Sequence, residues 1–398
     1  MPRRLLHVVR SLRAETGGVA TAVRQLTTAL QARGHAVAIA SLDPADAGQP
    51  DLSVVGRSSA GYGYAGDFVP WLRERRQDFD AVLVHGLWQY PGLGTWRALH
   101  GTSTPYLVYC HGMLDPWFKR TYPLKHAKKW LYWPWAEYRV LRDAARVLFT
   151  CEEERRLARQ SFWLYRAKEE VVPLGLPEPP VESARQREAF RALAPALADR
   201  PFLLFLGRLH PKKGLEELLR GYAAARSGGG DWPDLVIAGP CRDESYRAAL
   251  QGLAAELKAT AVVHWLPMIE GDAKWGALRA CAAFVLVSHQ ENFGLAVVEA
   301  LACRRPVLIS DQVNVWREIV ADGAGFAAPD SVAGATQLLQ RWANCARDER
   351  EQTARAARDC FARRFAIDTA VARLEAVVEE TLADSTRAGT STTLRSAP

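Results

Sequence analysis

The sequence predicts an α/β protein built from two successive doubly wound domains, each a parallel sheet covered by helices. Short apolar runs typical of buried strands alternate with helical patterns along almost the whole chain. At 398 residues the chain is longer than a single hydrophobic core usually supports, so two domains are expected.

The first set of elements opens with the buried-strand run LLHVV, followed by Gly17-Gly18 and a helical pattern from Val19 to Ala32. Residues 44–66 are rich in glycine, serine and aspartate and are expected to form a loop. Further strands are predicted at 81–86, 106–112 and 146–150. The first two of these end in His-Gly, at the edge where ligands bind in open parallel sheets.

The second set begins after the proline-rich segment 171–185, which we interpret as the connection between the domains. Strands are expected at 201–207, 234–239, 261–266, 283–288 and 306–310, and helices at 214–226, 243–257, 272–281 and 295–303. The predicted boundaries are an N-terminal domain at 1–176, a C-terminal domain at 177–365, a helix near 366–383 that returns to the first domain, and a disordered tail at 384–398.

Composition favours a cytoplasmic enzyme that lies, at most, on the inner face of the plasma membrane. No apolar run approaches the ~18–20 residues that span a bilayer. The seven cysteines are scattered and are expected to be reduced. Residues 1–175 hold 24 Lys/Arg against 16 Asp/Glu, whereas residues 176–398 hold 27 against 28. The basic first half therefore indicates an anionic partner for that half.

The segment HQENFGLAVVEALACRRPVLIS at 289–310 carries the clearest chemical signal. Glu291 follows a strand, Phe293-Gly294 opens a helix whose free N–H groups favour an anion, and Glu299 lies one turn later. Carboxylates only accept hydrogen bonds, and sugar hydroxyls donate them. Two glutamates eight apart are commonly ordinary surface residues, but the strand, glycine and helix around them favour a sugar-nucleotide site.

The segment FLGRLHPKKG at 205–214 places two cations around a strand end and a helix start. Arg208 follows Gly207, and Lys213 comes five residues later, before Gly214. A guanidinium fork and a compact ammonium in this arrangement can converge on one diphosphate, although solvated loop cations would look the same.

These segments together resemble the C-terminal domain of the retaining glycosyltransferases of family 4, the group 1 glycosyltransferases, which have the GT-B fold. The resemblance extends over residues 5–380 and implies that Gly207, Arg208, Lys213 and Gly214 bind the donor diphosphate. It also implies that Glu291 and Glu299 bind the donor sugar and ribose, with Asn292, Phe293, Gly294 and Leu295 beside them. The turn at Gly17 and Gly18 matches the glycine turn that approaches the donor in the family.

The resemblance also singles out His111, in CHGMLDPW, as the histidine that lies near the donor sugar in many relatives. It implies a hydrogen bond to a sugar hydroxyl or stabilisation of positive charge at the reacting carbon. His85 ends a similar strand, and for it a structural role is favoured. Asp115 either orients the acceptor or begins a turn before Pro116.

Three features depart from the family pattern. Arg304 stands where the helix after Glu299 normally ends in glycine, at a cost of order 1 kcal/mol if the left-handed backbone is kept. Leu174 stands in the linker where relatives have asparagine, and the sequence QVNVWREI at 312–319 places Asn314 and Trp316 where a donor-pocket loop is expected.

A basic aromatic stretch at 117–142 holds seven Lys/Arg, one acidic residue, four Trp and three Tyr. This composition suits a helix on an anionic membrane, single-stranded nucleic acid, or a partly buried helix with a solvated basic face. Pro123 and Pro134 argue against one long helix.

We therefore predict a glycosyltransferase with two Rossmann-like domains facing a cleft, which moves a sugar from a nucleotide diphosphate sugar to a hydroxyl of a glycan or lipid-linked glycan. The resemblance implies retention of configuration and synthesis of a bacterial surface polysaccharide. We expect no metal, no other cofactor and no nucleic acid partner. The alternatives are a nucleotide-sugar epimerase on the same fold and a non-catalytic protein that binds membranes or nucleic acid.

Overall fold

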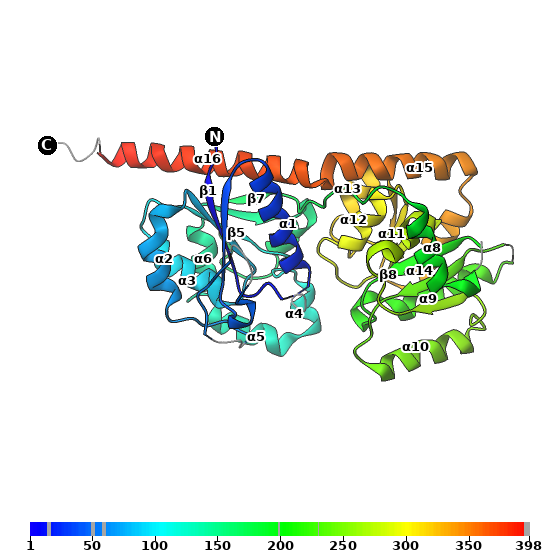
Figure 1. Cartoon of the computed structure of the whole chain (residues 1–398). Coiled ribbons are helices and arrows are strands. Elements are labelled where there is room, and N and C mark those ends of the chain that lie inside the picture. Colours follow the sequence, from blue (N-terminus) through cyan, green and yellow to red (C-terminus); the bar gives the residue numbers. More distant parts are fainter. Residues whose placement is uncertain (14–16, 49–51, 58–60, 198–199, 230, 394–398) are drawn as a thin grey trace. The chain divides into compact units, whose positions relative to one another are not determined.

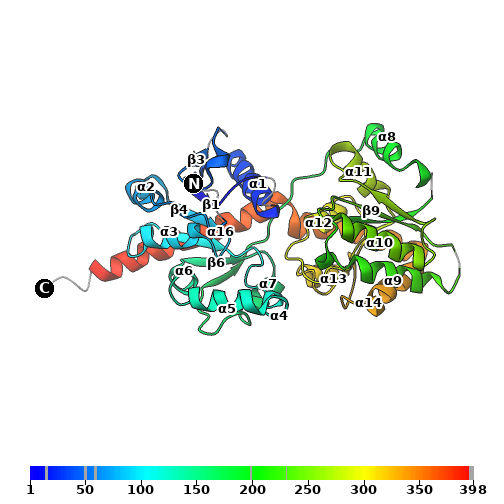
Figure 2. The same cartoon turned by 90° about the horizontal axis from the view of Figure 1, so that it is seen from below.

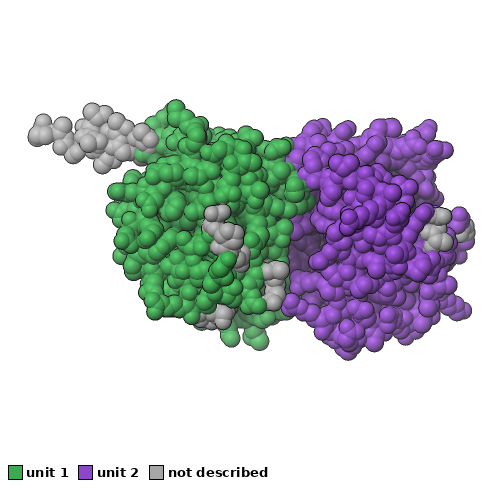
Figure 3. Space-filling model, in the orientation of Figure 1, with its two compact units in different colours: residues 1–177, 367–398 green, residues 178–366 purple. Residues whose placement is uncertain are grey.

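The computed structural model describes the whole chain except residues 14–16, 49–51, 58–60, 198–199, 230 and 394–398 (Figure 1). It divides into two compact units (Figure 3). Unit 1 comprises Met1–Pro177 and Ile367–Pro398, and unit 2 comprises Glu178–Ala366. These divisions fall one residue from the boundaries expected from the sequence.

Unit 1 contains a seven-stranded parallel sheet with strand order β3-β2-β1-β4-β5-β6-β7. The strands are β1 (Arg4–Val9), β2 (Ala36–Ser41), β3 (Leu52–Val54), β4 (Ala81–His85), β5 (Tyr106–Tyr109), β6 (Arg146–Phe149) and β7 (Glu169–Val171). The helices are α1 (Gly18–Ala32), α2 (Phe68–Arg75), α3 (Tyr90–Leu99), α4 (Trp117–Thr121), α5 (Pro123–Tyr132), α6 (Glu137–Asp143), α7 (Glu152–Ala158) and α16 (Ile367–Thr393).

The two faces of this sheet are covered by different helices. On one face α2, α3 and α6 pack on Leu6, Val8 and the other strand residues of the main core. On the other face α1 packs beside α16, the long C-terminal helix drawn in red in Figure 1. Because side chains alternate along a strand, each face receives every second residue.

Two expectations for unit 1 were wrong and one is confirmed. The loop predicted at 44–66 contains the short strand β3, which pairs in parallel with β2. The tail predicted to be disordered at 384–398 is helical as far as Thr393, where α16 ends, and residues 394–398 lie outside the described residues. Within the extended part of this helix, Asp384 forms an ion pair with Arg146 at 2.8 Å. In agreement with the sequence, Pro123 begins α5 and Pro134 lies between α5 and α6.

Unit 2 contains a six-stranded parallel sheet with strand order β10-β9-β8-β11-β12-β13. The strands are β8 (Phe202–Leu206), β9 (Asp234–Ala238), β10 (Val263–Leu266), β11 (Ala283–Leu286), β12 (Val307–Ser310) and β13 (Gly325–Ala328). The helices are α8 (Ala184–Leu193), α9 (Leu215–Arg226), α10 (Glu244–Glu256), α11 (Gly271–Ala280), α12 (Leu295–Ala302), α13 (Trp316–Ala321), α14 (Val332–Ala343) and α15 (Arg347–Cys360).

Helices also pair around the second sheet. Figure 2 shows α9 beside α14 and α11 beside α8. The α9–α14 contact is close because Gly221 faces Ala335, where an added Cβ would lie 2.5 Å from the alanine methyl. Both units thus have the doubly wound parallel topology that the alternating patterns predicted. All seven cysteines are free, as expected.

Candidate active site

The residues of unit 2 that are predicted to bind the sugar donor lie close together, at the point where the strand order of the sheet reverses. The first strand of the unit, β8, lies in the sheet between β9 and β11, so the chain winds outward on both sides of it. Ligands in such sheets bind beyond the carboxyl ends of the strands at this switch point. Arg208 and Lys213 follow β8, and Glu291 follows β11, so the topology alone brings the three residues to one place.

The turn that carries Lys213 is fixed against the end of β11. Gly214 has a φ of 63°, and a Cβ there would lie 1.9 Å from the carbonyl oxygen of Val287, so only glycine fits. The backbone oxygen of Lys212 accepts hydrogen bonds from the N–H of His289 at 2.8 Å and from Oγ of Ser288 at 3.0 Å. The two donor segments are therefore held together by backbone contacts.

Charge complementarity completes this contact. Lys213 forms an ion pair with Glu291, which is about four-fifths buried. Burial by itself would raise the pKa of Glu291, but Lys213, Lys212 and Arg208 lower it below its usual value. Glu291 is therefore an anion at neutral pH, and Arg208 lies exposed within the same positive field.

Glu299 lies at the second position that the sequence predicted for a donor carboxylate. It sits in α12, and its Oε1 accepts a hydrogen bond from Lys274 of α11 at 2.7 Å. Gly294 at the start of α12 has a φ of 70°, which brings the helix N-terminus close to the Glu291 side chain. Phe293 is buried against Phe365, so only its backbone can take part in the predicted donor contacts.

The segment after β12 reaches back to the donor loop. Asn314 is buried, and its side chain donates to Oδ1 of Asn292 at 3.2 Å, while its N–H donates to the carbonyl of Glu291 at 2.9 Å. Trp316 begins α13, with the Arg317 guanidinium 4.3 Å from its ring. This segment therefore helps to shape the loop at Glu291, in line with the sequence prediction.

In unit 1, His111 ends a row of three histidines, of which His7 and His85 are buried and His111 is partly exposed. Nδ1 of His7 lies 2.7 Å from Nε2 of His85, and Nδ1 of His85 lies 3.0 Å from Nε2 of His111. The rings are stacked, with Tyr109 beside them. His7 and His85 project from β1 and β4, which flank the switch point of this sheet.

The histidine row also determines which proton His111 offers. Burial lowers the pKa of His7 and of His111 to about 4, and burial lowers that of His85 well below its usual value. All three are neutral at pH 7, so each carries one N–H. Nε2 of His7 is buried and has no hydrogen-bond partner among the described residues. Burying an acceptor nitrogen without a partner costs less free energy than burying an N–H group without one. This favours a chain in which Nδ1–H of His7 donates to His85 and Nδ1–H of His85 donates to His111. Nδ1–H of His111 is then free to donate.

The turn that holds His111 has a strained backbone and is held in place by a buried carboxylate. His111 has a φ of 50°, a rare backbone conformation for a residue other than glycine. The buried carboxylate of Glu154 accepts hydrogen bonds from the N–H of Gly112 at 2.5 Å and from N–H and Oγ1 of Thr150 at 2.6 and 2.7 Å. Glu154 thus positions the turn, a role that no sequence pattern indicated.

The remaining predicted residues of unit 1 form turns. Oδ1 of Asp115 accepts from the N–H of Trp117 at 2.8 Å, which favours the turn-forming role over direct contact with an acceptor. Gly17 precedes α1 with a φ of 79°, and Gly18 is the first residue of that helix.

Sequence reasoning missed His7, Glu154 and Lys274. The signal for His7 was a histidine inside a strand pattern otherwise made of apolar residues. Lys274 and Glu154 had no comparable pattern, because each acts on a residue that is distant in sequence.

Two family models match the chain in tandem. The model described as Glycosyl transferase 4-like domain matches residues 17–175, and the model described as Glycosyl transferases group 1 matches residues 186–359. Their boundary falls where the chain passes from unit 1 to unit 2.

Relatives and solved structures agree with this match. The chain is 30% identical over 197 residues to a D-inositol 3-phosphate glycosyltransferase of Kineococcus radiotolerans, which covers 48% of this chain and 45% of the relative. It is 31% identical over 276 residues to the protein of that name in Geodermatophilus obscurus, covering 66% of this chain and 59% of the relative. The chain thus spans about half the length of the curated relatives it matches.

The similarity to solved structures extends along nearly the whole chain. A sucrose-phosphate synthase from Thermosynechococcus elongatus has a TM-score of 0.72 at 19% identity, covering 96% of this chain and all of the other. The HepE protein of Anabaena, solved with UDP, has a TM-score of 0.75 at 16% identity, covering 95% and 100%. These likenesses support the GT-B fold, and with the two family models they show that the chain belongs to the group 1 glycosyltransferases of family 4.

Proposed function

We propose that this protein transfers a sugar from a nucleoside diphosphate sugar to an acceptor hydroxyl, with retention of configuration. The observation that carries the proposal is the convergence of Arg208, Lys213, Glu291 and the N-terminus of α12 at the switch point of unit 2. A diphosphate needs cations and free N–H groups, and a sugar needs a carboxylate that accepts from its hydroxyls. Two loops held together by backbone hydrogen bonds provide both.

In this proposal the positive groups stabilise the charge that develops on the departing diphosphate. Arg208 is exposed and offers a bidentate fork, while the ion pair with Glu291 holds Lys213 in place before the donor arrives. Preorganised charge of this kind usually contributes most to lowering a barrier. The two cations can supply the positive charge that a metal would supply, so we propose that the transfer does not depend on a metal. Measuring activity in the presence of excess chelator tests this directly.

His111 acts in this proposal as a neutral hydrogen-bond donor to the donor sugar. The direction of donation along the histidine row leaves its Nδ1–H available. Its low pKa means that it stays neutral throughout the physiological range. This role favours the hydrogen bond to a sugar oxygen over stabilisation by a charged imidazolium.

For the acceptor we propose a lipid-linked or glycan hydroxyl at an anionic membrane surface, bound through the segment 117–142. Leu124, Leu131 and Trp135 are 82%, 77% and 70% exposed on or beside α5, and Lys125 and Lys128 are exposed on the same helix. Exposed apolar and basic residues together suit a membrane interface. No described helix is long and apolar enough to cross a bilayer.

The membrane proposal is tested by charge reversal at the exposed lysines of α5. Lys129 does not belong to the exposed set, because its Nζ lies 4.4 Å from the Trp88 ring and burial lowers its pKa to about 8. Charge reversal at Lys125 and Lys128 is expected to weaken co-sedimentation with phosphatidylglycerol vesicles. Reversal of the exposed Arg242 and Lys258 in unit 2 should leave it unchanged. Equal binding by all variants would remove the membrane proposal without affecting the donor proposal.

The donor proposal is tested with a panel of UDP-, GDP- and ADP-sugars, scored for thermal stabilisation and for transfer. The acceptor panel includes inositol phosphates, since the relatives carry that acceptor in their name. We expect Arg208→Ala to abolish stabilisation, and Arg242→Ala, an exposed arginine of the same unit, to retain it. No response to any nucleotide sugar would refute the proposal.

Product analysis separates the reaction from its rivals. The anomeric configuration of the product, read by NMR, distinguishes retention from inversion. An epimerase would change the sugar without an acceptor, and a non-catalytic membrane protein would bind vesicles and turn over no donor. A role in surface polysaccharide synthesis is part of the proposal and is supported if the accepted substrate is a lipid-linked glycan.

A further inference from the structure

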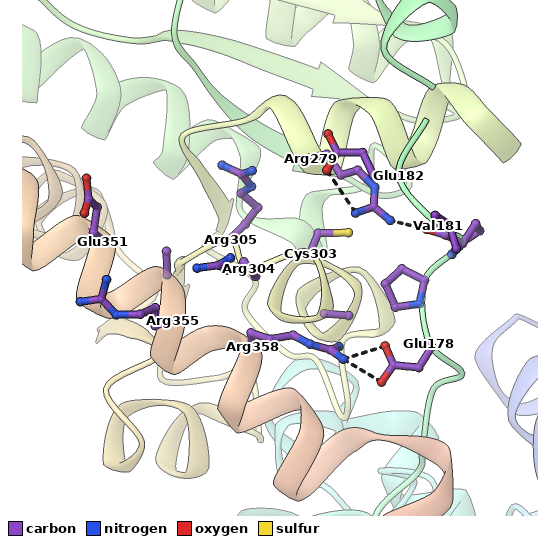
Figure 4. A pocket seen from close by; sticks show the side chains of 14 residues that line it. Glu178, Val181, Glu182, Arg279, Cys303, Arg304, Arg305, Glu351, Arg355 and Arg358 are labelled. Atoms are coloured by element: carbon purple, nitrogen blue, oxygen red, sulfur yellow. Dashed lines mark hydrogen bonds and ion pairs between the residues drawn. The ribbon is translucent and has the colours of Figure 1, made fainter. Parts of the chain in front are cut away.

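Unit 2 has a polar cavity of about 600 Å³, whose lining is drawn in Figure 4. It lies at the opposite edge of the sheet from the donor residues. The cavity is lined by the end of α12 and the residues after it, by Arg279 of α11, by one side of α15, and by segment 178–182. The strands β11 and β12 begin just after α11 and α12, so this is the amino edge of the sheet. The donor residues follow the carboxyl ends of the same strands, and none of them lines this cavity.

The cavity carries an excess of positive charge. Its lining includes five arginines against three glutamates; the arginines are Arg279, Arg304, Arg305, Arg355 and Arg358. Glu178 pairs with Arg358 at 2.8 Å, and Glu182 lies 4.0 Å from Arg279. Glu351 pairs with Arg347, which is outside the lining.

Within the part of the chain that the structure describes, three of the arginines therefore have no carboxylate partner. The side chains of Arg304 and Arg355 make no hydrogen bond or ion pair with any described residue. Arg305 donates one hydrogen bond, to the carbonyl of Cys281 at 3.2 Å, which caps the end of α11. This capping contact gives Arg305 a partial structural role. No comparable contact with a described residue gives one to Arg304 or Arg355.

Two further N–H groups of the lining are buried and lack partners. They are Nε of Arg305 and Nη1 of Arg358, neither of which has a hydrogen-bond acceptor among the described residues. A buried N–H group without a partner is costly, and both of these groups belong to guanidiniums that line the cavity.

Arg304 stands in this cavity at a conformational cost. It follows α12 with a φ of 59°, and the N–H groups of Arg304 and Arg305 donate to the carbonyls of Leu301 and Ala300 at 3.0 and 2.9 Å. This is the helix ending that favours glycine at the position of Arg304. The left-handed backbone is kept although an arginine occupies it, so the cost of about 1 kcal/mol attached to that conformation applies at this position.

We propose that this cavity is a binding site for a phosphate-bearing anion, either a phosphomonoester or a diphosphate. Guanidinium groups from three separate elements suit the several oxygens of such a group, and the planar fork of arginine binds two of them at once. Segment 178–182 opens unit 2, and α15 precedes the point where the chain leaves it. An anion held between them would tie together the two chain segments that connect unit 2 to unit 1, which is a natural position for an effector.

The test uses inorganic pyrophosphate as the probe, titrated calorimetrically into the full chain. Donor-site binding is removed with Arg208→Ala, so that the remaining binding reports the cavity. Into that background we place Arg304→Gly with Arg355→Ala, or Arg242→Ala as the matched control. Arg304→Gly relieves the left-handed strain, so a folding failure is not expected, and the thermal midpoint verifies this. A second arm replaces pyrophosphate with vesicles containing phosphatidic acid, which offers the phosphomonoester on a lipid.

Loss of two guanidinium contacts is expected to weaken pyrophosphate binding by roughly a hundredfold, about tenfold for each arginine, whereas Arg242→Ala has no effect. Binding in the vesicle arm alone would identify a lipid headgroup as the source of the anion. Absence of both kinds of binding once Arg208 is removed, or equal binding by the Arg304/Arg355 variant, would overturn the proposal. The inference does not rest on sugar transfer: loss of UDP binding in Arg208→Ala tests the donor site, and loss of pyrophosphate binding in the Arg304/Arg355 variant tests this cavity.

Discussion

Gly214 provides the most direct test of how the donor turn is held. In Gly214→Ala the new methyl would carry two separate costs. The left-handed φ of 63° destabilises alanine by about 1 kcal/mol after allowance for the stiffer unfolded chain. The Cβ would also lie 1.9 Å from the oxygen of Val287, so the turn must move, which adds about 1–3 kcal/mol.

Gly229 offers a matched control in the same unit. It has a φ of 77°, but no atom lies within 4 Å of an added Cβ, so Gly229→Ala carries only the conformational cost. For a unit of this size 1 kcal/mol shifts the melting temperature by about 2–4 °C. We therefore expect a fall of about 2–4 °C for Gly229→Ala and about 6–12 °C for Gly214→Ala, whose total cost is about 3 kcal/mol.

Differential scanning calorimetry measures both shifts, and titration with UDP reports the donor site. Displacement of the turn moves Lys213 away from Glu291, so UDP binding should weaken in Gly214→Ala and remain in Gly229→Ala. If the two variants lost equal stability and bound UDP equally, glycine would be needed at position 214 only for its backbone conformation. The close approach to Val287 would then have no part in positioning Lys213.

Three further predictions concern other parts of the chain. Arg304→Gly should stabilise unit 2 by about 1 kcal/mol, or about 2–4 °C in a thermal melt, because it removes the left-handed penalty; unchanged or lower stability would contradict the strain at that position. Glu137 is buried, which raises the pKa of its carboxyl to about 8, so the folded chain keeps a proton that the unfolded chain loses. The free energy of unfolding of the wild type, relative to that of Glu137→Gln, should therefore fall as pH rises from about 4.5 to about 8. Urea titrations at several pH values measure this, and a free-energy difference that does not change with pH would be inconsistent with the raised pKa. His85→Phe keeps a ring in the stack but removes both hydrogen bonds to the neighbouring histidines. It should therefore lower kcat of transfer more than it raises KM, and His85→Asn should recover part of the lost activity. Equal activity of the two variants would argue against a positioning role.

Much of the donor half of the site could be predicted from sequence because its signals are local. A strand, a glycine turn and a helix occupy consecutive residues around Arg208 and around Glu291, and each pattern reports its own segment. The left-handed ending at Arg304 was anticipated only through the resemblance to the family, whose members normally have glycine at that helix end. The short strand β3 was missed because three residues in a polar region give no measurable alternation.

The histidine row shows the opposite case. His7, His85 and His111 are far apart in the chain, and their hydrogen bonds exist only because β1, β4 and β5 are neighbours in the sheet. The support of the His111 turn by Glu154 likewise joins residues from different elements.

The sequence alone determined that this chain forms two doubly wound parallel sheets, where its strands end, and which residues stand at those ends. These properties follow from hydrophobic periodicity, glycine placement and chain length, all of which act over a few neighbouring residues. Only the tertiary structure decided that Lys213 pairs with Glu291, that the three histidines form one row, and that five arginines surround a cavity at the amino edge of the second sheet. Those contacts depend on which strands become neighbours, and strand order is set by packing of the whole unit, which no short stretch of sequence contains.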